Sequence, residues 1–315
     1  MSVFVNPVWD PAAVAPPSAD ALAFHRALPG YAPTPLRELV SGVLVKDESD
    51  RLGLPAFKVL GASWAGERAL REQPDVHTLV AASAGNHGRA VAHVAARRGL
   101  AARIFLPSRA RPARREAIAR EGAEVVIVDG DYEEAVARAA AEGTRPGCFE
   151  LADVGDGGAA AWVVDGYATL FAELADQAAF DAILVPAGVG SLAAAAARFG
   201  AQEGVEVWAV EPETAACVTA SLAAGAPVAV PTPGTTMAGL DCAEVSVAAW
   251  PSLRDGLRGT VTVSDDEAAI AMTELAAVGM VIGECGAAPL AALPAAREAS
   301  DFATVVLIAT EGLTA

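Results

Sequence analysis

The chain has 315 residues, of which 53% are hydrophobic and only 5% aromatic, so its core is built mainly from alanine, valine and leucine. Its net charge of −17 and isoelectric point of about 4.6 argue against nucleic-acid binding and against docking on an anionic membrane. A local site can still bind a small anion against this overall field.

The four cysteines are widely separated and lack CxxC spacing, so they predict neither a zinc site nor a disulfide framework. Reduced thiols in a cytoplasmic protein are the simpler expectation. Residues 1–20 contain no lysine or arginine and no continuous apolar segment, so no signal peptide is expected. Charge or glycine interrupts the other apolar stretches, so no membrane span is expected.

Strands and helices alternate along the chain after a proline-rich segment, residues 1–20, which is expected to be an extended arm. The predicted order is strand 41–49, helix 57–72, strand 76–83, helix 86–99, strand 102–107, helix 112–122, strand 123–130, helix 132–143, helix 157–178, strand 181–188, helix 191–200, strand 205–212, helix 214–225, helix 265–279, helix 286–299 and strand 304–310. Short apolar strands between helices predict parallel sheets covered on both faces. We expect two sheets, one near 76–150 and one built from the remainder.

Lys58 lies in the apolar stretch LGLPAFKVLGAS, near the start of the helix predicted at 57–72. Lys58 and Lys46 are the only lysines, since every other basic residue is arginine. Arginine stays protonated, whereas a desolvated lysine can lose its proton and attack a carbonyl group. The alternative is a lysine whose stem packs while its ammonium reaches water.

A first small-residue loop, AASAGNHGRAVA, joins a predicted strand to a predicted helix at 81–92. Ser83, Gly85 and the backbone amides before the helix could form a nest for an anion. Asn86 and His87 belong to the same turn. Capping of the helix by Ser83 or Asn86 is an equally good explanation of this loop alone.

A second loop of this kind is VPAGVGSLAAAAARF at 185–199, where a buried strand leads directly into an alanine-rich helix. Gly188 and Gly190 allow the backbone amides to turn inward, and Ser191 adds a hydroxyl group. Together with the positive end of the helix, these groups predict a phosphate site. The alternative is an ordinary strand-to-helix turn. The loop matches neither GxGxxG nor the GK[ST] of a P-loop, so a nucleotide-binding Rossmann protein is disfavoured.

One ligand pair accounts for the lysine and both loops. A phosphorylated aldehyde would bond to Lys58 and place its phosphate in one loop, while the other loop would hold a substrate carboxylate. Pyridoxal phosphate and an amino acid fit this description.

The chain resembles the fold-type II pyridoxal-phosphate enzymes, the group of threonine dehydratase and the tryptophan synthase β-subunit, and is most similar to the diaminopropionate ammonia-lyase family. The resemblance begins near residue 31 and runs to the end of the chain. The segments that carry it, in order, are KDESDRLGLPAFKVLGAS (46–63), SAGNHGRAVA (83–92), PAGVGSLA (186–193), TTMAGLDC (235–242), GECGAAPLAAL (283–293) and ATEGLT (309–314).

The resemblance implies an α/β fold with two parallel-sheet αβα domains and the active site between them. A large cofactor-binding domain would comprise 1–75 and 156–315, and a small domain, 76–155, would carry the substrate-carboxylate loop. It further implies a homodimer that binds a small amino acid, with no nucleic-acid or membrane partner.

The resemblance also implies roles for individual residues. Lys58 would be the lysine that bonds to the cofactor aldehyde, and Asp153 would be a second active-site acid. Thr310 would be the neutral partner of the cofactor's pyridine nitrogen. The remaining cofactor contacts would be Asn86 at the phenolic oxygen and Gly188, Val189, Gly190 and Ser191 at the phosphate. The substrate carboxylate would bind Ser83, Ala84, Gly85, Asn86 and His87. No metal ligand is implied.

One position departs from the ammonia-lyase pattern. That family carries Thr-Asp-Gly-Asn-His where this chain has Ser83 to His87, so Ala84 replaces an aspartate proposed to act as a base there. Alanine at this position is typical of serine and threonine dehydratases.

The expected reaction is therefore α,β-elimination from 2,3-diaminopropionate or a related small β-substituted amino acid, giving a 2-oxo acid and ammonia. Three alternatives remain: a serine or threonine dehydratase, a β-replacement synthase, and a non-catalytic cofactor-binding sensor. Assays of products with and without acceptor nucleophiles would distinguish them.

Overall fold

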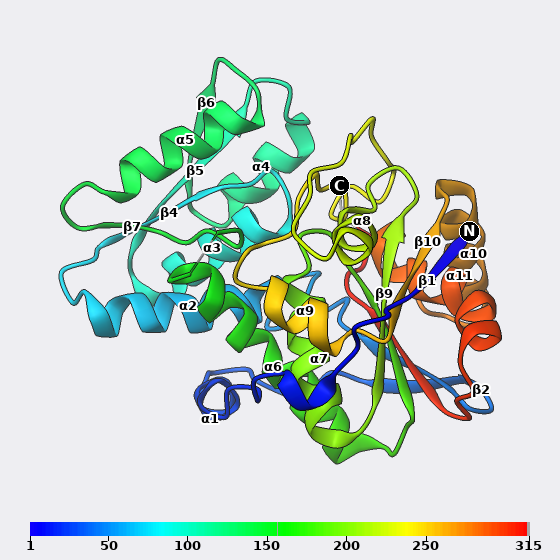
Figure 1. The fold of residues 1–315 in the computed structure, drawn as a ribbon. Helices are drawn as coiled ribbons and strands as arrows, with labels where there is room; N and C mark the ends of the chain where they lie inside the picture. Colours follow the sequence, from blue (N-terminus) through cyan, green and yellow to red (C-terminus); the bar gives the residue numbers. More distant parts are fainter. Residues whose placement is uncertain (156, 314–315) are drawn as a thin grey trace. The chain divides into compact units, whose positions relative to one another are not determined.

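The structure is a computed structural model that describes residues 1–155 and 157–313. The chain divides into two compact units (Figure 1). The first unit contains residues 1–57 and the described residues from 167 onward, and the second contains residues 58–166. Thr314, the last residue of the motif at 309–314, lies outside the described residues.

A seven-stranded sheet forms the centre of the first unit, in the order β1-β10-β9-β8-β11-β3-β2. Its inner strands run parallel, and the edge strands β1 and β2 are antiparallel to their neighbours. The strand bounds are β1 Ser2–Val5, β2 Leu36–Val40, β3 Val43–Asp47, β8 Ala182–Pro186, β9 Glu206–Pro212, β10 Gly259–Val263 and β11 Val305–Ala309. The carboxyl ends of the parallel strands share one edge, where ligands bind in such sheets.

Helices pack on this sheet through apolar side chains. The cluster includes Val45, Leu184, Trp208 and Leu307 from the strands, packed against alanines of the helix that follows residue 283. The helical segments of the unit are η1 Pro11–Ala13, α1 Asp20–Arg26, α7 Ser191–Glu203, α8 Cys217–Ala224, α9 Trp250–Gly256, α10 Asp265–Ala277 and α11 Glu284–Ala299. Helix α6, Ala159–Gln177, begins in the second unit and ends in the first.

Helix α10 begins at a reciprocal side-chain cap. The Ser264 hydroxyl accepts a hydrogen bond from the Glu267 amide, and the Glu267 carboxylate accepts one from the Ser264 amide. This reciprocal capping satisfies amides that have no partner within the helix. Asp265 and Asp266 add negative charge beside the positive end of the helix.

A cluster of fully buried charges joins α6 to β3 in the first unit. The Glu173 carboxylate accepts hydrogen bonds from Lys46 at 2.7 Å and from Arg51 at 2.6 Å. Arg51 also donates to Glu48 at 2.6 Å. Since buried charges are costly unless they are paired, the four residues depend on one another.

The second unit is built on a four-stranded parallel sheet in the order β6-β5-β4-β7. Val80, Phe105 and Val128 contribute to its core. Its strands are β4 Thr78–Ala82, β5 Ala101–Pro107, β6 Glu124–Val128 and β7 Cys148–Glu150. Its helices are α2 Lys58–Glu72, α3 Asn86–Arg98, α4 Pro112–Arg120 and α5 Tyr132–Gly143, together with the start of α6.

The structure confirms the two predicted sheets and every predicted strand and helix, with ends shifted by a few residues. It adds elements that the sequence analysis missed. Within residues 1–20, expected to be an extended arm, β1 pairs with β10, a partner more than 250 residues away. β7 has only three residues and β10 alternates threonine with valine, so neither forms an apolar run. None of the described helices is long and apolar enough to cross a membrane.

Candidate functional site

Lys58 is the first residue of α2, and its ammonium donates a hydrogen bond to Asp153 Oδ2 at 2.9 Å. Asp153 follows β7 in the same unit, 95 residues further along the chain. The two side chains are 20% and 17% exposed. An amine thus lies beside a carboxylate in a setting that is mostly removed from water, where their interaction is stronger than on the surface.

Asp153 is ionised in this setting. Burial alone would raise the pKa of its carboxyl group, but the charge that His87 carries when protonated and the charge of Lys58 outweigh burial and hold that pKa well below its usual range. A carboxylate that stays ionised can orient the Lys58 amine and influence when that amine carries a proton.

The His87 ring is 3% exposed and contacts the segment that follows β7. Nε2 lies 2.7 Å from the Leu151 carbonyl oxygen, and Nδ1 lies 3.7 Å from Asp153 Oδ2. The ring therefore contacts Asp153 directly, and the predicted contact of His87 with a substrate carboxylate concerns its backbone amide.

The 83–87 loop connects β4 to α3, as expected. The Ser83 hydroxyl accepts a hydrogen bond from the Gly85 amide at 3.2 Å. Gly85 is the N-cap residue, and no side chain caps α3, so the alternative of capping by Ser83 or Asn86 is wrong. A Cβ atom on Gly88 would lie 2.1 Å from the Ser83 carbonyl oxygen, so the loop needs glycine there. The positive end of the α3 dipole at this loop suits an anion.

The 188–191 loop leads from β8 into α7 in the first unit. Gly190 has a φ of +88°, and a Cβ atom there would lie 2.5 Å from Leu253 Cδ1. A Cβ atom on Gly188 would lie 2.8 Å from Cys242 Sγ and 3.0 Å from the Gly239 carbonyl oxygen. Gly188 is therefore required by its contacts, and Gly190 both by its contact and by its backbone conformation.

Flanking segments hold the carbonyl groups of this loop. The Gly188 carbonyl accepts a hydrogen bond from Cys217 Sγ at 3.4 Å, and the Val189 carbonyl accepts one from the Ser246 amide at 2.8 Å. Helix α7 begins at the buried Ser191 and has no side-chain cap. Its first amides and the positive end of its dipole suit a phosphate group.

Thr310 follows β11 and is buried. Its carbonyl oxygen accepts a hydrogen bond from the amide of Phe57 at 3.2 Å, and the Pro55 carbonyl accepts one from the Gly312 amide at 3.0 Å. These two bonds fix the segment that leads directly into Lys58.

Sequence reasoning assigned no role to the residues that support the glycine loop. Gly239 and Cys242 belong to TTMAGLDC, one of the segments that carry the family resemblance. That resemblance could have indicated that these two residues lie near the site. Cys217, Ser246 and Leu253 lie 25 residues or more from the loop in sequence, and no local pattern indicates their contact with it.

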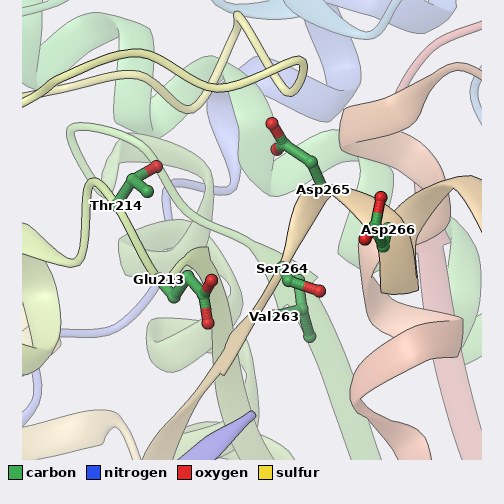
Figure 2. Close-up of a pocket in the computed structure, with 6 residues that line it drawn as sticks. All are labelled: Glu213, Thr214, Val263, Ser264, Asp265 and Asp266. Atoms are coloured by element: carbon green, nitrogen blue, oxygen red, sulfur yellow. The ribbon is translucent and has the colours of Figure 1, made fainter.

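A separate pocket in the first unit is lined by Glu213, Thr214 and residues 263–266, at the ends of β9 and β10 (Figure 2). Asp265 accepts hydrogen bonds from the Thr235 hydroxyl and the Thr236 amide, so it holds the preceding loop in place. The carboxylates of this pocket would repel a phosphate group. Across residues 1–155 and 157–313, no group of three or more histidine, cysteine or acidic side chains is placed to hold a metal ion.

Comparison with known proteins decides the family. The profile of the family described as "Pyridoxal-phosphate dependent enzyme" matches residues 27–311. This chain belongs to that family. Its fold is that of the fold-type II enzymes, and its cofactor is pyridoxal 5'-phosphate, as the sequence predicted.

Two related sequences and one solved structure are similar to this chain over most of its length. A diaminopropionate ammonia-lyase of Salmonella typhimurium is 33% identical over 319 residues, which cover 85% of this chain and 79% of the relative. An L-threonine dehydratase of Escherichia coli is 34% identical over 236 residues, covering 74% of this chain and 45% of the relative. The crystal structure of Escherichia coli diaminopropionate ammonia-lyase with an aminoacrylate-PLP azomethine intermediate has a TM-score of 0.90 and 29% identity, over 99% of this chain and 93% of that one.

The residues of this family member fit the cofactor. A Cβ atom at 188 or 190 would collide with residues packed against the 188–191 loop, and the loop ends at a helix start that no side chain caps. Lys58 supplies an amine beside an ionised carboxylate.

Proposed function

We propose that this enzyme eliminates the β-substituent of a small amino acid, 2,3-diaminopropionate or a close relative, and releases a 2-oxo acid and ammonia. The observation that carries the proposal is the Lys58–Asp153 pair, an amine and an ionised carboxylate 2.9 Å apart, in a pyridoxal-phosphate enzyme similar to diaminopropionate ammonia-lyases.

Pyridoxal phosphate, when bound, withdraws electron density from the substrate α-carbon. The other tasks fall to the chain. Lys58, as a neutral amine, takes the α-proton at Nζ and becomes an ammonium ion that Asp153 Oδ2 can hold. The amides at the start of α3 and the Ser83 hydroxyl orient the substrate carboxylate.

Residues of both units hold the cofactor in this proposal. The amides of residues 188–191 and the Ser191 hydroxyl hold its phosphate, Asn86 holds its phenolic oxygen, and Thr310 is the neutral partner of its ring nitrogen. The uncapped start of α7 and the buried position of Thr310 support these assignments. A neutral partner disfavours protonation of the ring nitrogen and so favours elimination over transamination.

A dehydratase acting on serine or threonine is the second candidate. The observation that favours it is Ala84, which places a methyl group where the ammonia-lyase pattern has a carboxylate. The L-threonine dehydratase relative supports the same alternative. A β-replacement synthase would use the same residues but would need a second nucleophile.

Product analysis distinguishes these candidates. The enzyme is incubated with D- and L-2,3-diaminopropionate, serine and threonine, and both ammonia and 2-oxo acid are measured. Diaminopropionate elimination gives two ammonia molecules per 2-oxo acid, whereas serine or threonine gives one. A fall in 2-oxo acid yield on adding a thiol would indicate β-replacement. No turnover despite bound cofactor would contradict the proposal and favour a sensor.

We further propose that the enzyme is a cytoplasmic homodimer. None of the described cysteines forms a disulfide, which supports a reducing compartment. Sedimentation of the holoenzyme tests the dimer, and fractionation of cells tests the location.

A further inference from the structure

His87 has a fixed tautomer. Its Nε2 atom lies 2.7 Å from the Leu151 carbonyl oxygen, and a carbonyl oxygen can only accept a hydrogen bond. Nε2 therefore carries the proton, and Nδ1 of the neutral ring presents a lone pair. Nδ1 is buried and has no hydrogen-bond partner among the described residues. A buried polar atom in this state needs an explanation.

Nδ1 and Lys58 face the same oxygen atom. Asp153 Oδ2 accepts a hydrogen bond from Lys58 Nζ at 2.9 Å and lies 3.7 Å from His87 Nδ1. The longer distance is beyond hydrogen-bond range, as expected when two lone pairs face each other. A proton added to Nδ1 would convert this contact into a donor directed at a carboxylate.

The charge of Lys58 decides which state of His87 is favoured. Burial lowers the pKa of the His87 imidazole, Asp153 opposes this effect, and the Lys58 charge adds to it. Asp153 and Lys58 are the charged groups that face His87 in the part of the chain that the structure describes. Neutralising Lys58 removes one cause of the low pKa and removes a positive neighbour from the buried Asp153 carboxylate.

We propose that His87 is a positioning residue that gains a proton at Nδ1 when Lys58 is uncharged and loses it when Lys58 is an ammonium ion. A positive charge thus stays beside Asp153 in both states, and the carboxylate keeps its orientation toward Lys58. The proton is exchanged with solvent. This inference rests on the proposed function in one respect, that Lys58 changes its charge during the reaction.

Nitrogen NMR of the histidine rings tests, without turnover, whether the protonation of His87 depends on the charge of Lys58. The full chain is labelled with ¹⁵N-histidine and prepared without pyridoxal phosphate, so that Lys58 is not bonded to the cofactor and can form its ion pair with Asp153. Long-range ¹H–¹⁵N correlations report the tautomer and protonation of each ring. The chain has four histidines, and His→Gln variants assign their signals.

In the wild type at pH 7, His87 should be neutral with its proton on Nε2. In Lys58→Met its pKa should rise by about one unit or more. Lys58→Arg retains the charge and should keep His87 neutral, and Lys58→Met/Asp153→Asn should return the pKa toward the wild-type value. His93 lies on the same helix as His87 and pairs with Glu121, so it should not respond and serves as the internal control.

The inference would be overturned if His87 had the same pKa in Lys58→Met as in the wild type. It would also be overturned if the raised pKa persisted in Lys58→Met/Asp153→Asn. Neither result depends on catalysis. If His87 responds to the charge of Lys58 but no amino acid releases ammonia, only the proposed function is contradicted. If elimination is found but His87 does not respond, only this inference is contradicted.

Discussion

Lys58 Nζ and Asp153 Oδ2 lie 2.9 Å apart, although 95 residues separate them in sequence. The lysine opens α2 and the aspartate follows β7, so the fold of the second unit creates the pair. This geometry supports the role that we propose for Asp153, which the sequence suggested only through resemblance.

Asp153→Asn should therefore lower kcat by about 10²-fold or more, because the amide cannot hold the Lys58 ammonium as a charge partner. The cofactor absorbance should remain, since the phosphate loop belongs to the other unit. Steady-state kinetics with diaminopropionate measures the effect, and Asp129→Asn, an exposed position in the same unit, is the control. An unchanged kcat would show that the pair is not used in turnover.

Gly190→Ala should weaken pyridoxal phosphate binding. The new Cβ atom would meet Leu253 Cδ1 at 2.5 Å and displace amides that hold the phosphate. Losing such charge-assisted bonds costs about 1.5–3 kcal/mol, or roughly 10- to 150-fold in Kd.

Gly204→Ala is the matched control for this change. Gly204 ends the same helix, also has a positive φ, and has open space around it. Fluorescence titration of the apoenzyme with cofactor compares the two variants. Equal affinities would mean that the 188–191 loop is an ordinary strand-to-helix turn.

Ala84→Asp should raise kcat/KM for diaminopropionate relative to serine by roughly tenfold, because it adds a carboxylate near the substrate amine. Ala84→Asn has nearly the same shape without the charge and should not. The wild type lacks this carboxylate, so Lys58 should be its only base, and the enzyme should prefer one enantiomer, L. Turnover of both enantiomers of diaminopropionate by the wild type, with none of serine or threonine, would refute this account of Ala84.

Glu173→Gln should destabilise the first unit by about 3–5 kcal/mol, because it leaves Lys46 and Arg51 buried without their shared carboxylate. Burial would raise the pKa of Glu173, but Arg51 and Lys46 outweigh burial and lower it. The stabilisation should therefore be present above a pH of about 4.5, the ordinary pKa of glutamate, and be lost as the pH falls through the folded-state pKa.

Urea unfolding at pH 7 and at lower pH measures this difference. Asp176→Asn lies on the same helix, where the aspartate is 71% exposed and pairs with the exposed Arg26. This control should cost less than about 1 kcal/mol. A Glu173 effect as small as that of the control would mean that the buried cluster adds little stability.

The sequence predicted what local patterns determine and missed what distant contacts determine. The apolar strands and the two glycine-rich turns are local, and the structure confirms the elements on which they lie. β1 has little pattern of its own and exists through its pairing with β10. The tautomer of His87 depends on the Leu151 carbonyl, 64 residues away, which no spacing rule could supply. The domain boundaries at 75/76 and 155/156 and the roles of individual cofactor contacts stay predictions.

The central claim, that Lys58 bonds to the cofactor, is tested most directly by reducing the holoenzyme with borohydride and locating the phosphopyridoxyl group by mass spectrometry. The chain has two lysines, and trypsin separates them at Arg51. The account predicts the group on the peptide from Leu52 to Arg68, which contains Lys58, and its absence from Lys58→Ala. A label on Lys46, or no label on either lysine of a cofactor-saturated protein, would contradict it.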